Sequence, residues 1–342
     1  MVSSTAEHSM SSPKPHRVMI LGGTGTIGQA VVRELIRRQY EVVCLVRNKD
    51  NNHSDGELAD RSPSLNGAII RYGDITDSGS LARDGFRGEP FNALVSCLAS
   101  RTGNPKDAWK IDYQAHVDAL AASRVAGLSH IVLLSAICVQ KPLLEFQKAK
   151  LAFEKILIES GLTYSIVRPT AFFKSLSGQI DRVRRGKPFL LFGNGTITSC
   201  KPISDDDLGR YIADCLVDMS LHNRVLPIGG PGSAITPKQQ GEYLFALLGK
   251  KPKFTHIPVA FLDMIIWTLR ILGNFIPRLS EKAELARIGR YYATESMLVL
   301  NPKTGQYDAD ATPSTGIETL KDFYSRLICE KTNVDRGDHA VF

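Results

Sequence analysis

A chain of 342 residues is long enough for one large α/β domain or for a core domain with an extension. Its 43% hydrophobic and 23% charged residues are ordinary for a globular enzyme, and no apolar run reaches the ~18 to 20 residues of a membrane span. The net charge of +7 would suit an anionic cofactor, an acidic substrate or an anionic membrane surface, and it equally suits a surface charged for solubility alone.

The six cysteines are scattered and form no Cys-x-x-Cys pair, and the eight histidines have no ligand spacing. This pattern predicts reduced thiols and argues against a disulfide framework, a zinc site or any other structural metal. Residues 1–16 are rich in serine and proline and are expected to be a disordered tail. They lack the apolar core of a secretory signal, whereas the remnant of an organelle transit peptide stays open.

The first structural signal is the segment Arg17 to Gly28, RVMILGGTGTIG, in which an apolar strand runs into a glycine turn and then a helix. From Thr26 onward Ile27, Val31 and Leu35 recur every four positions, as on one face of a helix. Such a turn lets backbone N–H groups approach a pyrophosphate, whose charge the helix N-terminus stabilises. The segment predicts a nucleotide-binding site, with a ligand-free tight turn as the alternative.

A second strand, Glu41 to Val46, ends next to Arg47. In NAD-binding units an acidic residue about 20 positions beyond the glycines binds the ribose hydroxyls. A guanidinium at that place can instead pair with a 2′-phosphate. We therefore predict NADP(H) binding through Arg47, with a solvated surface arginine as the alternative.

A loop is predicted at residues 48–66 and a third strand from Ala68 to Tyr72. Asp74 follows this strand, and its carboxylate could accept a hydrogen bond from the adenine amino group. Asp74 or the nearby Asp77 could equally cap the next helix, and the sequence leaves both roles open.

Further apolar strands alternate with helical segments along the chain. The strands are predicted at Ala93–Ser100, Ile131–Ile137 and Tyr164–Val167, and the helices at Trp109–Val125 and Leu144–Ser160. This alternation predicts an α/β fold, a doubly wound parallel-sheet Rossmann domain at residues 17–170. The active site should lie at the carboxyl ends of the strands.

Beyond Thr170 the pattern loosens, and we predict a smaller C-terminal α/β substrate region at residues 171–330, which can share elements with the core domain, followed by a tail at 331–342. Its predicted elements are Phe189–Gly195 and Val225–Gly232 as strands with turns, a capped helix from Ile203 to about Met219, and a helix at Pro237–Leu248.

The segment Val259–Ile276 is strongly apolar, but Asp263 and Arg270 interrupt it, so it is too charged to span a bilayer. It could form a wall of a substrate pocket, lie on a membrane surface, or be a buried helix of the smaller domain.

Short-chain reductases of this fold often place a serine after strand five and a Tyr-x-x-x-Lys pair on the next helix. The lysine then lowers the tyrosine pKa and holds the cofactor ribose. Here the serine is Ser135 and the lysine is Lys150, but Phe146 stands in the tyrosine position. Phenylalanine cannot deliver a proton. Either the chemistry does without this phenol, another group supplies the proton, or the protein is not a catalyst.

Several blocks resemble the NADPH-dependent divinyl chlorophyllide 8-vinyl reductases, which belong to the atypical short-chain dehydrogenases/reductases. The most specific are SAICVQKPLLEFQKAK and VRPTAFFKSLSGQ, and CKPIS, VLPIGGPG and IGRYYATESM add to them. The likeness runs from about residue 17 to about residue 330. It implies reduction of the 8-vinyl group of divinyl chlorophyllide to ethyl with NADPH as hydride donor, in a chloroplast or in the cytoplasm of a phototrophic bacterium.

The resemblance also implies roles for individual residues. The vinyl group is conjugated to a macrocycle that can delocalise charge, so the chemistry does not require a phenol at Phe146. Lys150 is expected at the nicotinamide ribose, with a further role in proton delivery left open, and Ser135 is either a positioning hydroxyl or merely bonded to backbone. The predicted cofactor-binding residues are Gly22, Thr24, Gly25, Thr26, Ile27, Gly28, Arg47, Asp74, Ile75, Leu98, Lys150, Pro169 and Phe172.

Other side chains are weaker candidates. Lys148 and Lys174 could meet a substrate carboxylate, although Lys148 falls on the helix face opposite Lys150 and is better explained as a surface lysine. Tyr291 and Tyr292 could touch the substrate or only pack, and the proton could come from water, a lysine or a tyrosine. A peripheral membrane contact is compatible with a tetrapyrrole substrate, and the sequence leaves the oligomeric state open.

Two other functions remain open at this point. The first is another NADPH-dependent reductase of a conjugated small molecule, such as an isoflavone-reductase-like protein. The second is a regulator or assembly factor that binds NADP(H) without consuming it, because such a protein would also lack the phenol.

Overall fold

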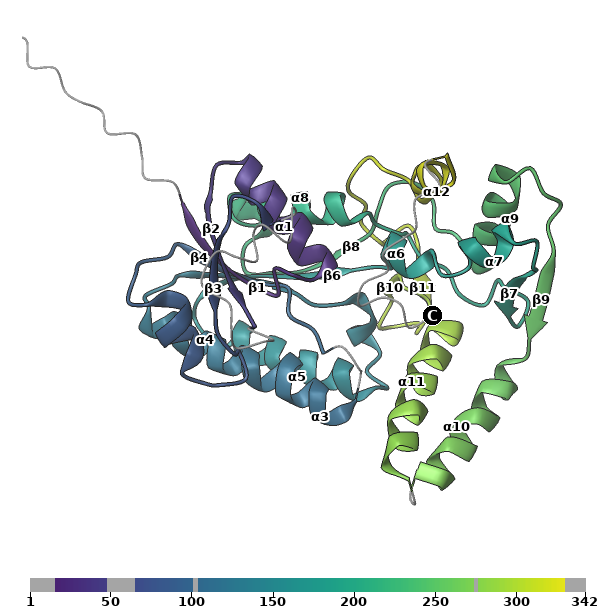
Figure 1. The fold of residues 1–342 in the computed structure, drawn as a ribbon, viewed down its shortest axis with the longest axis horizontal. Helices are drawn as coiled ribbons and strands as arrows, with labels where there is room; N and C mark the ends of the chain where they lie inside the picture. Colours follow the sequence, from purple (N-terminus) through teal and green to yellow (C-terminus); the bar gives the residue numbers. More distant parts are fainter. Residues whose placement is uncertain (1–15, 48–64, 101–103, 274–275, 330–342) are drawn as a thin grey trace, which may run out of the picture.

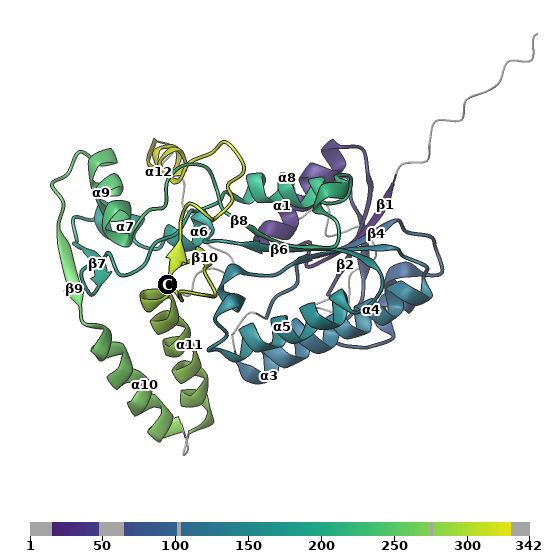
Figure 2. The same cartoon turned by 180° about the vertical axis from the view of Figure 1, so that it is seen from behind.

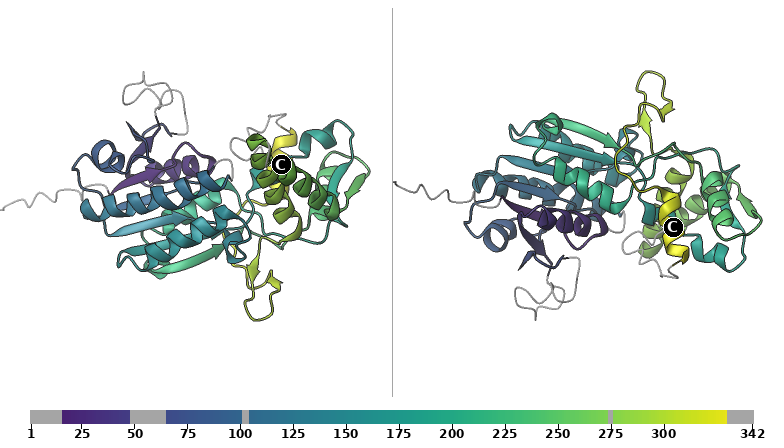
Figure 3. Two further views of the ribbon diagram at one scale, coloured as in Figure 1. Left: turned by 90° about the horizontal axis from the view of Figure 1, so that it is seen from below. Right: turned by 90° about the horizontal axis from the view of Figure 1, so that it is seen from above.

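The computed structural model describes residues 16–47, 65–100, 104–273 and 276–329. Nearly all of the predicted tail at 1–16, most of the predicted loop at 48–66, and the tail at 331–342 lie outside these residues. The described chain forms two parts that lie side by side, one layered around a large sheet and a smaller one rich in short helices (Figures 1 and 3).

The large sheet has seven parallel strands in the order β3-β2-β1-β4-β5-β6-β8. This order reverses beside β1, and the crevice at such a switch point is where doubly wound sheets bind ligands. The prediction of an α/β fold with a parallel sheet is confirmed. The strands are β1 (Arg17–Leu21), β2 (Glu41–Val46), β3 (Ile69–Tyr72), β4 (Ala93–Ser96), β5 (His130–Leu134), β6 (Thr163–Pro169) and β8 (Arg224–Ile228).

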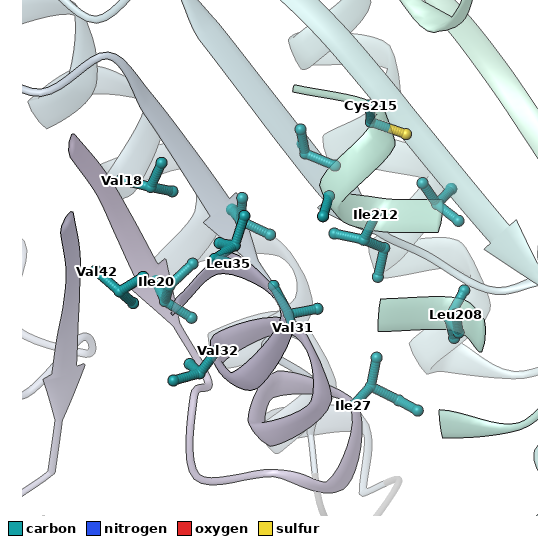
Figure 4. Packing of buried hydrophobic residues seen from close by; sticks show 14 of the residues in the cluster. Val18, Ile20, Ile27, Val31, Val32, Leu35, Val42, Leu208, Ile212 and Cys215 are labelled. Atoms are coloured by element: carbon teal, nitrogen blue, oxygen red, sulfur yellow. The ribbon is translucent and has the colours of Figure 1, made fainter. Parts of the chain in front are cut away.

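Helices cover both faces of this sheet. One face carries α1 (Thr26–Arg37) and α8 (Asp205–Asp214), and the other carries α4 (Ala115–Val125) and α5 (Glu145–Ile158) (Figures 1 and 2). Figure 4 shows the first interface, where strand side chains such as Val18 meet α1 and α8. Ile27, Val31 and Leu35 are all buried there, as their spacing predicted.

The last strand and its helix come from beyond residue 170. Both α8 and β8 follow the first excursion of the chain into the smaller part, and β8 pairs in parallel with β6. Helix α8 crosses α1 closely at Gly209. The approach is so close that a Cβ at this position would lie 2.9 Å from the carbonyl carbon of Ala30. A strand was predicted at Val225–Gly232 but assigned to the smaller C-terminal region, whereas the structure places it as the seventh strand of the large sheet.

Several predicted elements are shorter than expected. Strand β4 ends at Ser96 rather than at residue 100, because the chain leaves the sheet to pass over the glycine turn, where the Cys97 carbonyl lies against Gly22. Strand β5 ends at Leu134. The helix expected at Trp109–Val125 divides into a π-helical segment and α4. The remaining short elements are η2 (Leu81–Phe86), α3 (Pro105–Ala108), η3 (Trp109–Gln114), η4 (Ile137–Gln140), α6 (Phe173–Leu176), α7 (Ile180–Arg184) and η5 (Met219–Leu221).

The smaller part has a core of its own. Aromatic rings of Phe173, Phe189, Phe245 and Tyr324 are buried together between short helices and a two-stranded parallel sheet. Its elements are β7 (Phe189–Phe192) and β9 (Phe254–Ile257), α9 (Pro237–Leu247), the terminal helix α12 (Leu320–Cys329), and the strand pair β10 (Val299–Leu300) and β11 (Tyr307–Asp308).

Helices α10 (Val259–Gly273) and α11 (Pro277–Thr294) pack side by side as a hairpin that projects from the body of the molecule (Figures 1 and 2). Not one residue of α10 is buried. The interpretation of residues 259–276 as a buried helix is therefore wrong, because α10 packs mainly along α11 and leaves its other side exposed. Among the described residues, no helix is both long and apolar enough to cross a membrane.

Candidate functional site

The turn after β1 is closed so tightly that two of its positions accept only glycine. Gly22 has a φ of +75°, and a Cβ there would lie 2.8 Å from the Cys97 carbonyl. A Cβ on Gly28 would lie 2.1 Å from the Gly22 oxygen. The turn is further held by a 3.1 Å hydrogen bond from Gly25 N–H to the Gly22 oxygen and by a 2.9 Å bond from the Gln29 side chain to the Thr24 oxygen. The backbone is thus left bare, as close approach of a ligand requires.

The N-terminus of α1 is free to bind an anion. Gly25 is its N-cap, no side chain caps the helix, and its first turn contains no acidic residue. The N–H groups of a first turn have no partners within the helix, and the helix dipole makes this end partially positive. The bare turn and the uncapped helix together fit the pyrophosphate of a dinucleotide. They support the prediction for Gly22, Thr24, Gly25, Thr26, Ile27 and Gly28.

Arg47 is exposed just after β2, and its charge acts on Asp74 after β3. The pKa of Asp74 lies below its usual range, chiefly because Thr76 donates backbone N–H and hydroxyl hydrogen bonds, both 2.9 Å, to Asp74 Oδ1. The positive charges of Arg47 and Lys110 lower it further. Asp74 therefore shapes its own turn, and its contact with adenine stays a prediction. Two more of the predicted positions, Ile75 and Leu98, pack half-buried against the core beneath the sheet.

Lys150 is buried on α5 and forms an ion pair with Asp112 of η3. Its Nζ lies 2.9 Å from Asp112 Oδ1, and the carboxylate is fully buried. Asp112 also accepts a 2.6 Å hydrogen bond from the Ser100 hydroxyl, from the segment that follows β4. A buried cation with one buried partner is held in a single place. Sequence reasoning missed Asp112, which stands among other polar residues in the segment WKIDYQ and belongs to no recognised motif.

A buried histidine lies beneath this pair. His116 Nε2 is 2.8 Å from the Ser96 hydroxyl, and its Nδ1 is 2.9 Å from the Ile111 oxygen. Burial, reinforced by the charge of Lys150, lowers the pKa of His116 to about 4. The ring is therefore neutral at physiological pH and does not compete with Lys150 for Asp112.

The Ser135 hydroxyl has a partner that neither of its two predicted roles named. Its hydroxyl donates a 2.5 Å hydrogen bond to Glu154 Oε1, and Glu154 forms a buried ion pair with Arg168 at the end of β6. The hydroxyl thus binds a buried carboxylate instead of backbone. These three side chains join α5 to β5 and β6. The single proton of the Ser135 hydroxyl is donated to Glu154, so in this arrangement Ser135 could position a ligand only by accepting a hydrogen bond.

A cavity of about 470 Å³ opens next to Lys150. Phe146 and Lys150 line it from α5, and Pro169, Thr170 and Phe172 line it from the end of β6. Two of the three predicted catalytic residues, Phe146 and Lys150, thus share one cavity with the residues expected at the nicotinamide, whereas Ser135 is not among the residues that line it. Helix α11 also contributes to the lining, through Leu285, Ile288, Gly289, Tyr292 and Ala293. None of the described residues of this segment, 259–273 and 276, lines the cavity, so the interpretation of the segment as a pocket wall is not supported.

The cavity is mostly apolar with a few polar groups, which suits a flat hydrophobic ligand. Tyr292 lines it, whereas Tyr291 is buried and donates hydrogen bonds of 2.9 and 3.1 Å to the Cys138 and Lys141 oxygens. Of the two tyrosines, therefore, Tyr291 packs and Tyr292 faces the ligand space. Glu295 also lines the cavity, but Lys141 neutralises it at 2.7 Å.

The two candidate lysines for a substrate carboxylate are both paired with acids. Lys148 is exposed and lies 2.7 Å from Glu145, and Lys174 lies 3.0 Å from Asp205. Neither lysine lines the cavity. All six cysteines are free thiols, and the described part of the chain contains no cluster of His, Cys, Asp or Glu that could hold a metal ion.

Comparisons with known proteins agree with this geometry. Residues 22–219 match a family model described as NAD(P)H-binding. The chain is 49% identical over 338 residues to "Divinyl chlorophyllide a 8-vinyl-reductase, chloroplastic" of Cucumis sativus, covering 97% of this chain and 81% of that one. It is 26% identical over 254 residues to "Photosystem II assembly factor Ycf39" of Cyanophora paradoxa, covering 72% and 73%.

Among solved structures, the NADPH complex of the quinone oxidoreductase QOR2 from Escherichia coli superimposes with a TM-score of 0.66. It covers 91% of this chain and 99% of that one at 18% identity, a likeness of fold alone. The extent and level of identity to the cucumber protein establish the relationship that the sequence blocks and the site had indicated. The chain belongs to the divinyl chlorophyllide a 8-vinyl-reductase family.

Proposed function

We propose that this protein reduces the 8-vinyl group of 3,8-divinyl chlorophyllide a, or its protochlorophyllide counterpart, to an ethyl group during chlorophyll biosynthesis in the chloroplast. The observation that carries the proposal is an apolar cavity lined by Lys150, with Phe146 in the position where related reductases have a tyrosine. The chain that forms this cavity is 49% identical to a reductase of this name. NADPH, when bound, supplies a hydride to the vinyl group.

The cofactor would be held by groups already described. The glycine turn and the uncapped N-terminus of α1 would bind the pyrophosphate. Arg47 would pair with the 2′-phosphate, and Lys150 would donate hydrogen bonds to the nicotinamide ribose. Asp112 supports this last role, because it keeps the ammonium of Lys150 in one place at the cavity wall.

Phe146 fits an alkene better than a carbonyl. Reduction of a carbonyl produces an alkoxide that needs an acid at the oxygen, which a tyrosine usually provides. The 8-vinyl group is conjugated to the macrocycle, which spreads the negative charge and leaves no oxygen to protonate. An aromatic ring at Phe146 can instead pack against the flat pigment. The proton would come from water, Lys150 or Tyr292, all of which can reach the cavity space.

The direct test is incubation of the full chain with NADPH and divinyl chlorophyllide a, followed by chromatography and mass spectrometry. The expected product has gained two hydrogens, and its Soret band moves to the blue. The matched control is the pigment whose 8-position already carries an ethyl group, which should leave NADPH unconsumed. An unaltered vinyl group in the presence of bound NADPH would contradict the proposal.

A second function has some support in the likeness to the photosystem II assembly factor of Cyanophora paradoxa. A protein of that kind would bind NADPH and leave its near-ultraviolet absorbance constant whatever pigment is added. The difference between 49% and 26% identity favours the reductase. A reductase of another conjugated molecule would consume NADPH, but not with divinyl pigments.

We also propose a peripheral contact with a membrane, since the substrate is a hydrophobic tetrapyrrole. This contact would bring the protein to the thylakoid or envelope surface from the stromal side.

A further inference from the structure

Helix α10 presents a continuous apolar face to the solvent. On a helix with 3.6 residues per turn, its exposed large side chains fall within a sector of roughly 140°. The only polar residue in this sector is Thr268, whose hydroxyl donates a 2.9 Å hydrogen bond back to the Met264 oxygen. The large side chains of this face are Phe261, Met264, Trp267, Ile271 and Leu272, and they are 42–65% exposed.

The opposite side of α10 is apolar too. It packs along α11 through half-buried residues such as Leu262, Ile266 and Leu269. The single acid of α10, Asp263, is neutralised by an ion pair with Arg290 of α11. Apolar residues on two sides of a helix are stable only where both sides meet an apolar environment. The protein supplies such an environment on one side of α10 only.

The size of the face argues against a second copy of the chain as the missing partner. Fifteen helical residues span about 22 Å, and a helix about 10 Å wide then offers roughly 220 Å² in projection. A standard stable interface takes about 800 Å² from each partner. A lipid surface needs neither this area nor a complementary shape, and tryptophan and phenylalanine are typical residues of helices that lie in it.

The charge of the hairpin favours an anionic lipid surface. Residues 259–294 contain five lysines and arginines against three acids, and the whole chain carries +7. Of the basic residues, Arg270 is exposed beside the apolar face, where it can reach phosphate headgroups. The hairpin also projects from the body, so a flat surface could touch it without a clash with the sheet (Figures 1 and 2).

The same hairpin leads to the cavity. Leu285, Ile288 and Tyr292 of α11 line one wall, and α11 is the helix along which α10 packs. We propose that α10 docks the protein on an anionic bilayer, and that a lipophilic substrate passes from the lipid along the α10–α11 hairpin into the cavity. The docking stands on the exposed face alone, whereas the passage of substrate rests on the proposed function.

The test uses the two tryptophans of the chain. In the full chain carrying Trp109→Phe, Trp267 is the only fluorophore of its kind. Vesicles of phosphatidylcholine with phosphatidylglycerol should shift its emission to the blue and co-sediment the protein, and brominated acyl chains should quench it. Vesicles of phosphatidylcholine alone should bind more weakly. Emission that is unchanged by anionic vesicles would overturn the proposal.

Variants place the contact on α10. Met264→Glu/Trp267→Glu should lower vesicle binding by roughly tenfold or more, because two apolar anchors become charged. The matched control, Met219→Glu/Ile317→Glu, changes two residues that are 82% and 84% exposed on other elements and should bind as the parent does. Both variants should keep their NADPH affinity, which reports that they are folded. Equal loss in both variants would overturn the assignment to α10.

Two other outcomes are informative. A dimer in sedimentation that only the α10 variant dissociates would mean that a second copy covers this face, and it would overturn the proposal. Reduction of detergent-dispersed pigment is measured separately. An enzyme that is active in detergent but does not bind vesicles would refute the docking and leave the function intact, and vesicle binding without reduction would do the reverse.

Discussion

Replacement of Lys150 by methionine separates its structural role from its chemical one. Lys150→Met keeps most of the volume of the side chain but leaves Asp112 as a buried carboxylate without its cation. Removal of one partner of a buried ion pair costs about 3–5 kcal/mol. The hydroxyl and backbone N–H of Ser100 still donate to Asp112, so we expect a loss near 3 kcal/mol in the free energy of unfolding.

The second variant, Lys150→Met/Asp112→Asn, removes the stranded charge as well. The amide at position 112 can still accept from Ser100, so stability should return to within about 1–2 kcal/mol of the parent. NADPH affinity and vinyl reduction should not return, because the ammonium is absent in both variants. Loss of a charge-assisted hydrogen bond of about 1.5–3 kcal/mol corresponds to a dissociation constant raised roughly 10- to 100-fold.

Urea unfolding followed by circular dichroism measures the first quantity, and NADPH fluorescence titration with pigment turnover measures the second. Parent-like stability of Lys150→Met would refute the reasoning about the buried pair. Recovery of activity in the double variant would refute the role of Lys150 at the cofactor, since that variant restores only the charge balance.

Three further results are expected. Arg47→Asp should weaken the binding of NADPH relative to that of NADH by roughly 2 kcal/mol, measured as the ratio of their dissociation constants. An unchanged ratio would contradict the assignment of Arg47 to the 2′-phosphate. Tyr292→Phe should lower pigment turnover more than Tyr291→Phe, because only Tyr292 lines the cavity, whereas Tyr291→Phe should lower thermal stability; the reverse order would place the reactive phenol elsewhere. Burial lowers the pKa of His116 and of His130 to about 4, against about 6.5 in the unfolded chain, so the unfolded state binds more protons between these values. Stability should thus be complete above pH 6.5 and fall by up to about 2 kcal/mol per histidine at pH 5, measured by urea titration, and a flat profile would contradict neutral burial.

The glycine turn and the first helix could be predicted because their signals are local. The glycines lie within seven residues, and the burial of Ile27, Val31 and Leu35 repeats with the helix itself. The pairing of Lys150 with Asp112 could not be predicted, because these residues lie 38 positions apart and meet only after two helices pack. Hydrophobicity likewise identified α10 as apolar but could not tell which side of it, if any, the protein would cover.

The phenylalanine in the tyrosine position was the most informative departure from pattern. It showed from the sequence alone that the usual phenol cannot supply the proton, and it left open whether another group does so, whether the chemistry needs no phenol, or whether there is no catalysis. The structure adds that Phe146 borders the same cavity as Lys150 and Tyr292, which no spacing between residues 146 and 292 could reveal. The partner of the Ser135 hydroxyl could not be predicted from the reductase pattern, because Glu154, to which it donates a hydrogen bond, lies on another element.

The seventh strand has a consequence for how the two halves of the molecule depend on each other. The chain crosses between the two parts after β6, after β7 and again after β8. Three connections therefore join the parts, which restricts their relative movement more than a single linker would. A further connection lies near the C-terminus, where the backbone N–H groups of Ile317 and Glu318 donate hydrogen bonds to buried Asp207 of α8. A fragment ending at residue 170 would lack β8 and α8. It would therefore expose the edge of β6 and leave part of one face of the large sheet uncovered. Mutations that destabilise the smaller part should therefore also weaken dinucleotide binding by the large sheet. The protein should unfold in a single thermal transition.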